Sequence, residues 1–263
     1  MSYKPSKYWV WLNEQMMEMF QKNNGYENFK RTAGHIYNDD YNGILNDDQR
    51  KIHNLNINSL WQSICKIVPK NIIDKFEEPL EGNPVTATLE GRNVSIDLGC
   101  SILEYWNLSQ HINFNEIDKI SEIGGGYGRT AYVITKLHPH IEYTLYDIEP
   151  TLSIAKRYLS SVAKWGNFKF KTPNKIGGKC DLLIAIDCLA EMTRKQVSAY
   201  FDYANKNSSY FFFVSWFLAN CAIDNIEWKM TDYPVRVDWK ELFKRPHIRD
   251  GWFEALYKIG NYE

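Results

Sequence analysis

The stretch Ser121–Thr130, SEIGGGYGRT, places four glycines within five residues, between an apolar run and the start of a helical pattern. Glycine allows backbone angles and close approaches that a Cβ atom forbids. The helix that follows offers unpaired N–H groups and the positive end of its dipole. We therefore expect a ligand to bind at this turn, although a glycine turn with a purely structural role is the alternative.

From residue 119 onward the chain alternates predicted strands with predicted helices. The segment LLIAI, residues 182–186, is wholly apolar, as strands are in a parallel sheet covered on both faces. We expect an α/β fold with a doubly wound, mostly parallel, Rossmann-like sheet, whose ligand site lies outside the carboxyl ends of the strands. Strands are predicted at 119–123, 141–147, 167–171, 182–186 and 210–217, with a last strand in 251–260 along the sheet edge; helices are predicted at 129–137, from Pro150 and from about 192 to 205.

The chain before residue 110 has a different texture, helical and irregular. Residues 47–68 repeat apolar side chains at helical spacing and are followed by Pro69, which predicts an amphipathic helix. The near alternation of β-branched residues around Glu90 and Gly91 predicts a small hairpin. We expect two parts: a mainly helical N-terminal extension or cap over 1–110, and a cofactor-binding core over 111–263.

Composition narrows the classes of protein. The formal net charge of the 263 residues is -1, which disfavours a nucleic-acid partner. The five cysteines include no CxxC pair, so neither a disulfide framework nor a thiolate zinc site is indicated. The N-terminal residues lack a signal-peptide pattern and no apolar run approaches a membrane span. We expect a cytoplasmic protein without membrane insertion.

The spacing of the glycines distinguishes between two kinds of cofactor. A dinucleotide site favours GxGxxG, and its third glycine would fall at Arg129. The frame present is ExGxGxG, with Glu122 at the end of the strand; a carboxylate there repels a pyrophosphate and suits an ammonium group. A dehydrogenase would also use a YxxxK pair, but Tyr132 and Lys136 follow the loop by one turn and are expected to line a helix face.

The segments EIGGGYGR and YTLYDIEP together resemble motif I and the acidic second-strand end of class I S-adenosylmethionine-dependent methyltransferases. The resemblance implies S-adenosyl-L-methionine as cofactor. It assigns the amino group of the cofactor to Glu122 and its ribose hydroxyls to Asp147. The remaining candidate cofactor-binding residues are Gly124, Gly125, Gly126, Gly128, Ile148 and Asp187.

A narrower resemblance joins three short segments, GNP (82–84), EIGGGYGR and DCLAEM (187–192). They are similar to bacterial proteins described as sugar O-methyltransferases. This implies a saccharide or sugar-linked acceptor, such as a precursor in capsule or lipopolysaccharide biosynthesis. A methyltransferase for another small-molecule acceptor and a non-catalytic Rossmann-like binding module are the alternatives.

An alcohol acceptor needs a base within reach of its proton. Asp187 and Glu191 follow the apolar strand LLIAI and are the first candidates, with His35 next. The structural alternatives are that Asp187 caps the next helix, that Glu191 is its first-turn acid, and that His35 is an exposed loop histidine. Arg129 could hold an anionic acceptor or pair with a carboxylate of the sheet edge.

No clustered metal-ligand pattern occurs in the sequence. Asp187 and Asn220 could be invoked for a divalent ion, but two oxygen ligands do not make a magnesium or calcium site. We expect activity without a metal. The choice of acceptor is expected to lie in the first hundred residues and in 220–252, both rich in Trp, Tyr and Asn, a composition that suits carbohydrates and equally describes a homodimer interface or ordinary packing.

Overall fold

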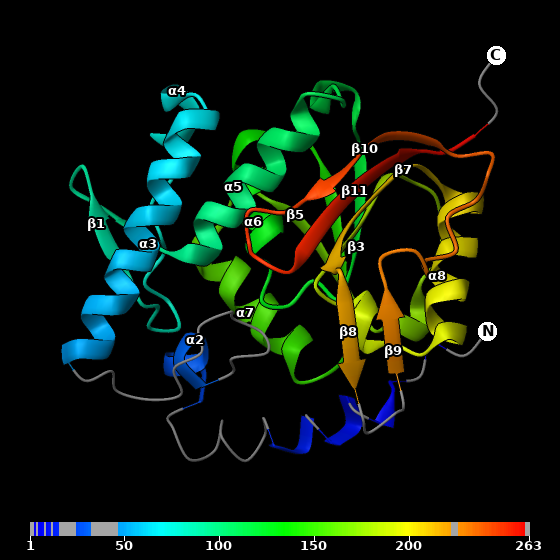
Figure 1. The fold of residues 1–263 in the computed structure, drawn as a ribbon, viewed down its shortest axis with the longest axis horizontal. Coiled ribbons are helices and arrows are strands. Elements are labelled where there is room, and N and C mark those ends of the chain that lie inside the picture. Colours follow the sequence, from blue (N-terminus) through cyan, green and yellow to red (C-terminus); the bar gives the residue numbers. More distant parts are fainter. Residues whose placement is uncertain are drawn as a thin grey trace.

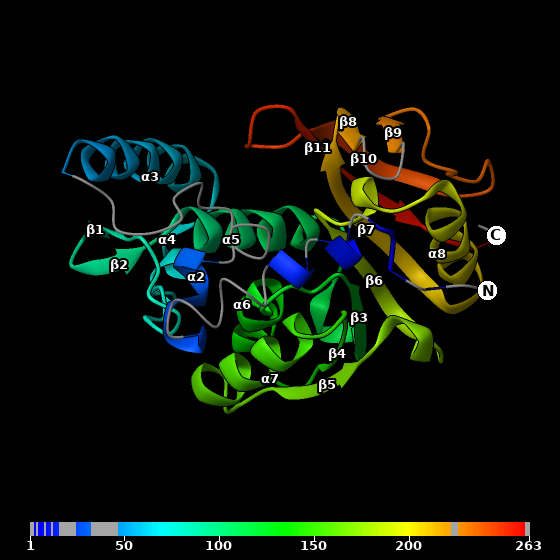
Figure 2. The same ribbon diagram turned by 90° about the horizontal axis from the view of Figure 1, so that it is seen from below.

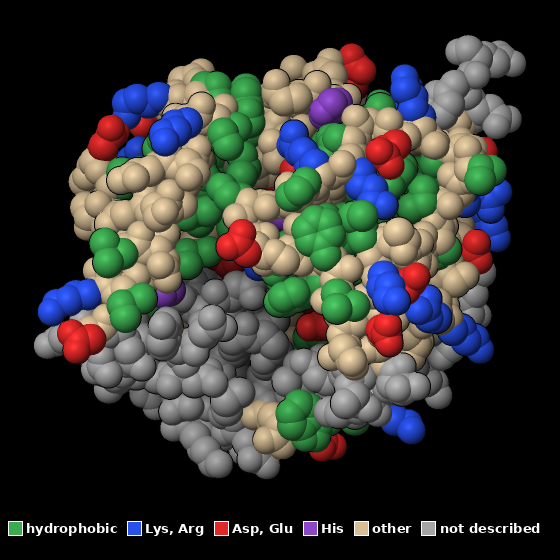
Figure 3. Space-filling model, in the orientation of Figure 1, with side chains coloured by type: hydrophobic (Ala, Val, Ile, Leu, Met, Phe, Trp, Pro, Cys, Tyr) green, Lys and Arg blue, Asp and Glu red, His purple; other side chains and the backbone are tan. Residues whose placement is uncertain are grey.

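The computed structural model describes residues 3, 5–7, 9–11, 13–15, 25–32, 47–221 and 226–260. A twisted central sheet with helices on both faces forms the larger part of the molecule (Figures 1 and 2). Acidic and basic side chains are interspersed on the face drawn in Figure 3. None of the helices in these ranges is long and apolar enough to cross a membrane.

The central sheet has seven strands in the order β10-β11-β7-β6-β3-β4-β5. Five neighbouring strands, from β7 to β5 in that order, run parallel, and β11 is antiparallel to both of its neighbours. The expected doubly wound, mostly parallel sheet is confirmed. The strands are β3 (Lys119–Ile123), β4 (Glu142–Tyr146), β5 (Asn167–Lys171), β6 (Cys180–Ile186), β7 (Ser208–Trp216), β10 (Lys240–Pro246) and β11 (Trp252–Lys258).

The expectation that the last strand forms the sheet edge is wrong. β11 lies between β7 and β10, and the edge strand is β10, which the sequence analysis did not predict. The physical reason lies in the two sequences. β10 reads KELFKRP, and charged residues with a terminal proline protect an exposed edge from further pairing. β11 is buried along most of its length, as an interior strand requires.

Each face of the sheet has its own apolar core. On one side lie α5 (Ile96–Ser109), α6 (Arg129–Leu137) and α7 (Thr151–Val162), and on the other α8 (Arg194–Asn207) (Figure 2). Beside α8, a cluster of aromatic rings covers β7 and β11. In that cluster Trp239 stacks on Phe201 with ring centroids 5.7 Å apart. Two short strands, β8 (Leu218–Cys221) and β9 (Ile226–Lys229), pair with each other outside the central sheet.

The N-terminal part packs against α5. The predicted amphipathic helix is present as α3 (Asp47–Ile67), and its Trp61 indole donates a hydrogen bond to the Ser95 carbonyl at 2.8 Å. The predicted hairpin is present, with Glu90 and Gly91 at positive φ in its turn. The remaining short elements are η1 (Gly25–Asn28), α2 (Phe29–Thr32), α4 (Lys70–Ile73), β1 (Ala87–Leu89), β2 (Arg92–Val94), η2 (Phe114–Glu116), η3 (Pro173–Lys175) and η4 (Leu189–Glu191).

A buried ion pair joins α2 to the rest of the molecule. The Lys30 ammonium donates to the Glu78 carboxylate, and both side chains are almost fully buried. Glu78 also accepts a hydrogen bond from the Ser95 hydroxyl, which caps α5. The ammonium lies 5.0 Å from the ring centroid of Tyr127 and 4.8 Å from that of Tyr158. This cation therefore links the N-terminal part to the glycine turn and to α7.

Replacing Lys30 by methionine should destabilise the protein by about 3 kcal/mol, because Glu78 would be left as an unpaired buried charge. The double variant Lys30→Met, Glu78→Gln should recover part of this loss. Urea denaturation measures both effects. Lys70→Met, which breaks an exposed ion pair, is the matched control and should cost much less, because solvent screens an exposed pair. Equal losses for the two lysines would show that the buried pair has no special role.

Candidate functional site

The glycine turn lies between β3 and α6, at the carboxyl edge of the sheet, where the sequence places it. Gly124, Gly126 and Gly128 have φ angles of 64°, 55° and 94°, in the left-handed region that side chains rarely adopt. The amide of Gly124 bonds to the Tyr146 carbonyl at 2.8 Å, which attaches the turn to the end of β4. The turn thus brings the ends of the two neighbouring strands together.

Three of the four glycines are also required by the protein's own packing. A Cβ atom on Gly124 would lie 2.5 Å from Cβ of Cys188, one on Gly125 2.8 Å from Leu145, and one on Gly128 2.6 Å from Leu159. Contacts under 3.0 Å force a shift of the neighbouring atoms. The structural alternative therefore accounts for part of the motif, and glycine content alone does not identify a ligand.

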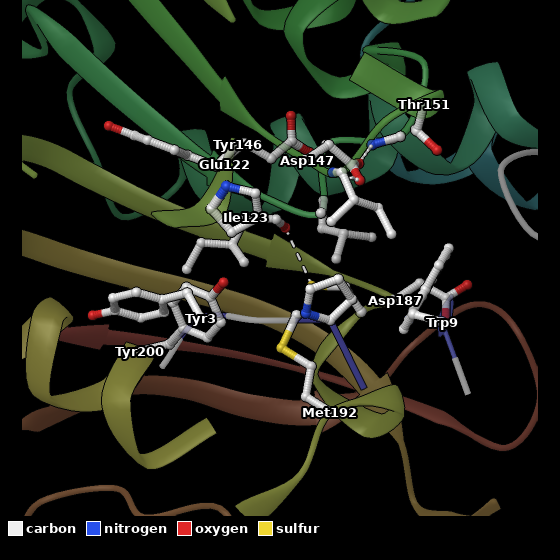
Figure 4. A pocket seen from close by; sticks show the side chains of 18 of the residues that line it. Tyr3, Trp9, Glu122, Ile123, Tyr146, Asp147, Thr151, Asp187, Met192 and Tyr200 are labelled. Atoms are coloured by element: carbon white, nitrogen blue, oxygen red, sulfur yellow. Dashed lines mark hydrogen bonds between the residues drawn. The ribbon is translucent and has the colours of Figure 1, made fainter. Parts of the chain in front are cut away.

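A cavity opens directly beside the turn and holds about 970 Å³ of space, part of it open to solvent. Figure 4 shows Glu122 and Asp147 on one side of the cavity, and Asp187 on the other side together with Tyr3, Trp9 and Tyr200. The candidate residues that line the cavity are Glu122, Gly124, Gly125, Gly126, Asp147, Ile148 and Asp187; Gly128 and Glu191 are not among its lining residues.

Asp147 follows β4 and is 8% exposed. Its two oxygens accept hydrogen bonds from the amides of Gly126, at 2.8 Å, and Ile148, at 2.7 Å. Burial raises the pKa of Asp147 to about 7, although both hydrogen bonds act to lower it. The helix α7 has Pro150 as its N-cap and no side-chain cap, so a capping role for Asp147 is excluded. Each carboxylate oxygen keeps a lone pair that a ligand hydroxyl can use.

Glu122, in β3, is the more deeply buried of the two carboxylates, at 2% exposure. The Tyr143 hydroxyl donates a hydrogen bond to it at 2.9 Å. Burial raises the pKa of Glu122 to about 8, against the opposing effects of the Tyr143 hydrogen bond and the Arg129 charge. A positively charged ligand group in the cavity would favour the ionised form of this carboxyl.

Asp187 and Glu191 lie where the fourth parallel strand, β6, ends. Asp187 has a φ angle of 55°, a strained conformation for a residue with a side chain. Burial, and next the charge of Asp187, raise the pKa of Glu191 well above its ordinary value. The N-cap of α8 is Thr193, in a capping box with Gln196. Asp187 therefore does not cap α8, and Glu191 lies before α8, as the acidic residue in the first turn of the short helix η4.

Arg129 is paired within the protein. Its guanidinium donates to the Ser101 hydroxyl at 2.7 Å and to Glu104 at 3.4 Å, and lies 3.8 Å from Asp97. These partners belong to α5. Arg129 therefore pairs with carboxylates, as one alternative predicted, but these carboxylates belong to helix α5 and not to the sheet edge. Tyr132 and Lys136, the pair expected on a helix face, are not among the cavity-lining residues. The Lys136 ammonium donates a hydrogen bond to the Tyr132 hydroxyl at 3.2 Å.

The N-terminal segment supplies part of the cavity, which sequence reasoning assigned only in general terms. Tyr3 packs against Tyr200 of α8, with ring centroids 5.0 Å apart, and the Ser6 hydroxyl donates to the Glu191 carbonyl at 3.3 Å. The Trp9 side chain hydrogen-bonds to the Glu191 carboxyl. The clustered aromatic residues near the N-terminus were the available signal. His35 lies outside the described residues.

The donor set fits S-adenosylmethionine better than a metal. In the part of the chain that the structure describes, no group of three or more His, Cys, Asp or Glu side chains is placed to hold a metal ion. Two buried carboxylates that line one cavity instead match a ligand with an ammonium group and vicinal hydroxyls. The strained Asp187 lies at the same cavity, where an acceptor can approach.

Residues 99–177 match the O-methyltransferase domain family. No curated protein matches the chain. The matched region runs from α5 through the glycine turn and β4 to η3, and includes Glu122 and Asp147. The carboxylates that sequence reasoning assigned to the cofactor are therefore inside the matched domain.

Two solved structures share the fold. The mitomycin 7-O-methyltransferase MmcR superposes with a TM-score of 0.51 at 12% identity, over 63% of this chain and 55% of that one. The magnesium protoporphyrin IX methyltransferase ChlM from Synechocystis PCC 6803, solved with bound S-adenosylmethionine, gives 0.50 at 12% identity over 98% of each chain. This chain spans about half the length of the first structures that it matches. The likeness to these two structures shows that this chain has the class I methyltransferase fold.

Replacing Glu122 by glutamine should stabilise the protein without its ligand. Between the ordinary carboxyl pKa of 4.5 and the folded value of about 8, the folded state holds a proton that the unfolded chain has released. The free energy of unfolding therefore falls as pH rises through this window. Glu122→Gln should reduce that dependence, leaving the part that Asp147 contributes, and raise stability at pH 8 by about 1 kcal/mol or more.

Thermal unfolding of both proteins between pH 5 and pH 8 measures this effect. Glu227→Gln, at an exposed carboxylate, is the control and should leave the pH dependence unchanged. An unaltered slope in Glu122→Gln would mean that another group carries the titration.

Proposed function

We propose that this protein transfers the methyl group of S-adenosylmethionine to a hydroxyl group of a saccharide or a sugar-linked molecule. The observation that carries the proposal is the single cavity that joins Glu122, Asp147 and Asp187 at the carboxyl edge of the sheet. Methyl transfer from a sulfonium is an in-line displacement, so the enzyme has to hold the donor, align the acceptor and exclude water. The three carboxylates and the segments around them can divide these tasks.

The first wall of the cavity would hold the cofactor. Asp147 would accept the two ribose hydroxyls, and Glu122 the amino group, directly or through water. The glycine turn, Gly124–Gly128, would pass beside the methionine part, and Ile148 would contact the nucleoside. S-adenosylmethionine supplies a methyl group activated by its positive sulfur. Its ammonium group would offset the cost of ionising Glu122, whose pKa burial raises.

The strand end at Asp187 would serve the acceptor. Asp187 or Glu191 takes the hydroxyl proton in this proposal. Burial and the Asp187 charge favour the protonated form of Glu191, since they raise its pKa. Asp187 is therefore the better candidate for the base, and Glu191 a donor that orients the acceptor. His35 is the next candidate, in a segment outside the described residues.

The N-terminal part, residues 1–110, would act as a cap on the core formed by 111–263. Tyr3 and Trp9 line the cavity opposite the cofactor carboxylates (Figure 4). The side chain of Asn13 donates to the Glu149 carbonyl at 2.9 Å, next to the end of β4. This segment would exclude water from the reacting groups after both substrates have bound.

The acceptor class rests on the aromatic surface beyond Asp187. Trp216 and Phe217 are 39% and 36% exposed where β7 ends, and Trp216 packs against Trp252 with ring centroids 4.3 Å apart. Figure 3 shows hydrophobic side chains on this face, over the ends of β7 and β11. Exposed aromatic faces beside carboxylates suit the apolar faces of a sugar ring. A cytoplasmic role in capsule or lipopolysaccharide biosynthesis would provide such an acceptor.

A second candidate is an O-methyltransferase for a ring-bearing small molecule that is not a sugar. The fold shared with the mitomycin 7-O-methyltransferase favours it. A methyl-transfer screen with sugar nucleotides, polysaccharide fragments and phenols, with S-adenosylhomocysteine release as readout, separates the two. Turnover of phenols alone would contradict the sugar proposal.

Calorimetry with S-adenosylmethionine tests the cofactor assignment. Asp147→Ala should weaken binding by roughly 1 to 3 kcal/mol, the usual cost of losing hydrogen bonds to a charged group. Gly126→Val should abolish binding, because its side chain would enter the cavity at a positive φ. Gly177→Ala, where a Cβ atom meets nothing within 4 Å, is the control. Tight NAD binding without any response to S-adenosylhomocysteine would reject the assignment.

The amide variants Asp187→Asn and Glu191→Gln test the base. Both should fold, and at least one should lower kcat by about 10²-fold or more with cofactor affinity nearly unchanged. Single-turnover methyl transfer and calorimetry measure the two quantities. Asp232→Asn, at an exposed carboxylate paired with Arg194, is the matched control. If Asp187→Asn mainly loses S-adenosylmethionine, Asp187 belongs to the cofactor site alone.

A further inference from the structure

The loop between β10 and β11 places a second arginine at the carboxyl edge of the sheet. Arg249 lies in this loop, and its side chain is 14% exposed. Nη1 of Arg249 is 3.9 Å from Oδ2 of Asp187. That separation is too long for a hydrogen bond, yet short enough for a strong attraction between the charges. The guanidinium therefore faces the strand end that we assign to the acceptor.

The local structure holds Arg249 in place. Its guanidinium carbon lies 3.8 Å from the ring centroid of Trp252, and its amide donates to Nδ1 of His247 at 3.1 Å. The loop is attached to the end of β7 by a 2.9 Å hydrogen bond from the Phe217 amide to the Gly251 carbonyl. Stacking on an indole fixes a guanidinium plane at little further entropy cost. Arg249 is thus positioned before any acceptor binds.

The two partly buried arginines at this edge of the sheet differ in the hydrogen-bond partners of their guanidinium groups. Arg129 meets Ser101, Glu104 and Asp97 and is accounted for by these partners. In Arg249, Nε and Nη2 are buried with no hydrogen-bond partner. Buried donors without partners are costly and uncommon. Ion pairs with α5 account for the position of Arg129, whereas Arg249 lies 3.9 Å from Asp187 and its charge also acts on Glu104.

We propose, resting on the methyl-transfer function above, that Arg249 and Asp187 together hold the acceptor oxygen. An oxygen about 2.8 Å from both Nη1 and Oδ2 fits between atoms that are 3.9 Å apart. The hydroxyl donates its proton to Asp187 and accepts from Arg249. The guanidinium then stabilises the negative charge that develops on the oxygen as the proton leaves.

This geometry selects oxygen over nitrogen. A hydroxyl oxygen has two lone pairs, so one can accept from Arg249 while the other attacks the methyl group. A neutral amine has a single lone pair and cannot do both. In the step, the oxygen forms the O–CH₃ bond, the S–CH₃ bond breaks with its electron pair remaining on sulfur, and the hydroxyl proton passes to Asp187.

A crystal structure of the complex with S-adenosylhomocysteine tests the geometry without a known acceptor. We expect a water oxygen within hydrogen-bond distance of both Arg249 and Asp187, in the place of the acceptor hydroxyl, and its loss in Arg249→Met. A direct hydrogen bond between the two side chains, with no oxygen between them, would overturn the proposal. Failure of the wild-type protein to bind S-adenosylhomocysteine would instead remove the methyl-transfer function itself.

Steady-state kinetics with an acceptor found in the methyl-transfer screen test the role of Arg249. Arg249→Met should lower kcat by about 10²-fold, with cofactor affinity changed less than about twofold, and Arg249→Lys should retain part of the rate. Arg236→Met, at an exposed arginine paired only with Asp238 among the described ion pairs, is the control. Mapping the product by NMR should place the methyl group on oxygen. Full turnover in Arg249→Met, or a methyl group on nitrogen, would refute the assignment.

Discussion

The buried charge of Arg129 is the interaction on which the carboxyl edge of the sheet depends. The residue comes directly after the glycine turn, and its guanidinium reaches Ser101 and Glu104 of α5. Burial acts to raise the pKa of Glu104, yet Arg129 and His247 hold that pKa below its ordinary value. Because a buried cation must be satisfied by fixed partners, the turn and α5 cannot move independently. The wall of the cavity is therefore set before a ligand arrives.

Around that fixed cation the site retains features that cost stability. Burial raises the pKa of Glu122 to about 8 and that of Asp147 to about 7, so ionising either carboxyl in the empty cavity is unfavourable. Asp187 holds a backbone angle that glycine usually supplies. Such costs persist where the surroundings enforce them and where a ligand or a reaction uses them. They coincide here with the end of three adjacent parallel strands, β4, β3 and β6.

Segments far apart in the chain complete the site. Tyr3 and Trp9, which line the cavity, come from the N-terminus, and Arg249, which lies beside Asp187, comes from the loop before the last strand. Both contact groups at the end of β6: Trp9 bonds to Glu191, and Arg249 faces Asp187. The loop after β10 reaches the same edge as the loops after the parallel strands, because β10 runs in the direction of β7. In the proposed function, the turn would hold the methyl donor and these outer segments the acceptor.

Local sequence determined the parallel sheet, the glycine turn with Glu122 and Asp147 at adjacent strand ends, and the helices near 47–68 and 129–137. Each follows from periodicity, glycine conformation and strand termini, which act over a few residues. Only the tertiary structure decided that β10 is the edge strand and that packing against Cys188, Leu145 and Leu159 requires three of the glycines. It also decided that Arg129 pairs with Glu104 of α5, whereas Arg249 lies beside Asp187. These outcomes depend on which distant side chains meet in the core. Contacts and charge pairs between residues far apart in the sequence produce no local sequence pattern, so they could not be predicted from it.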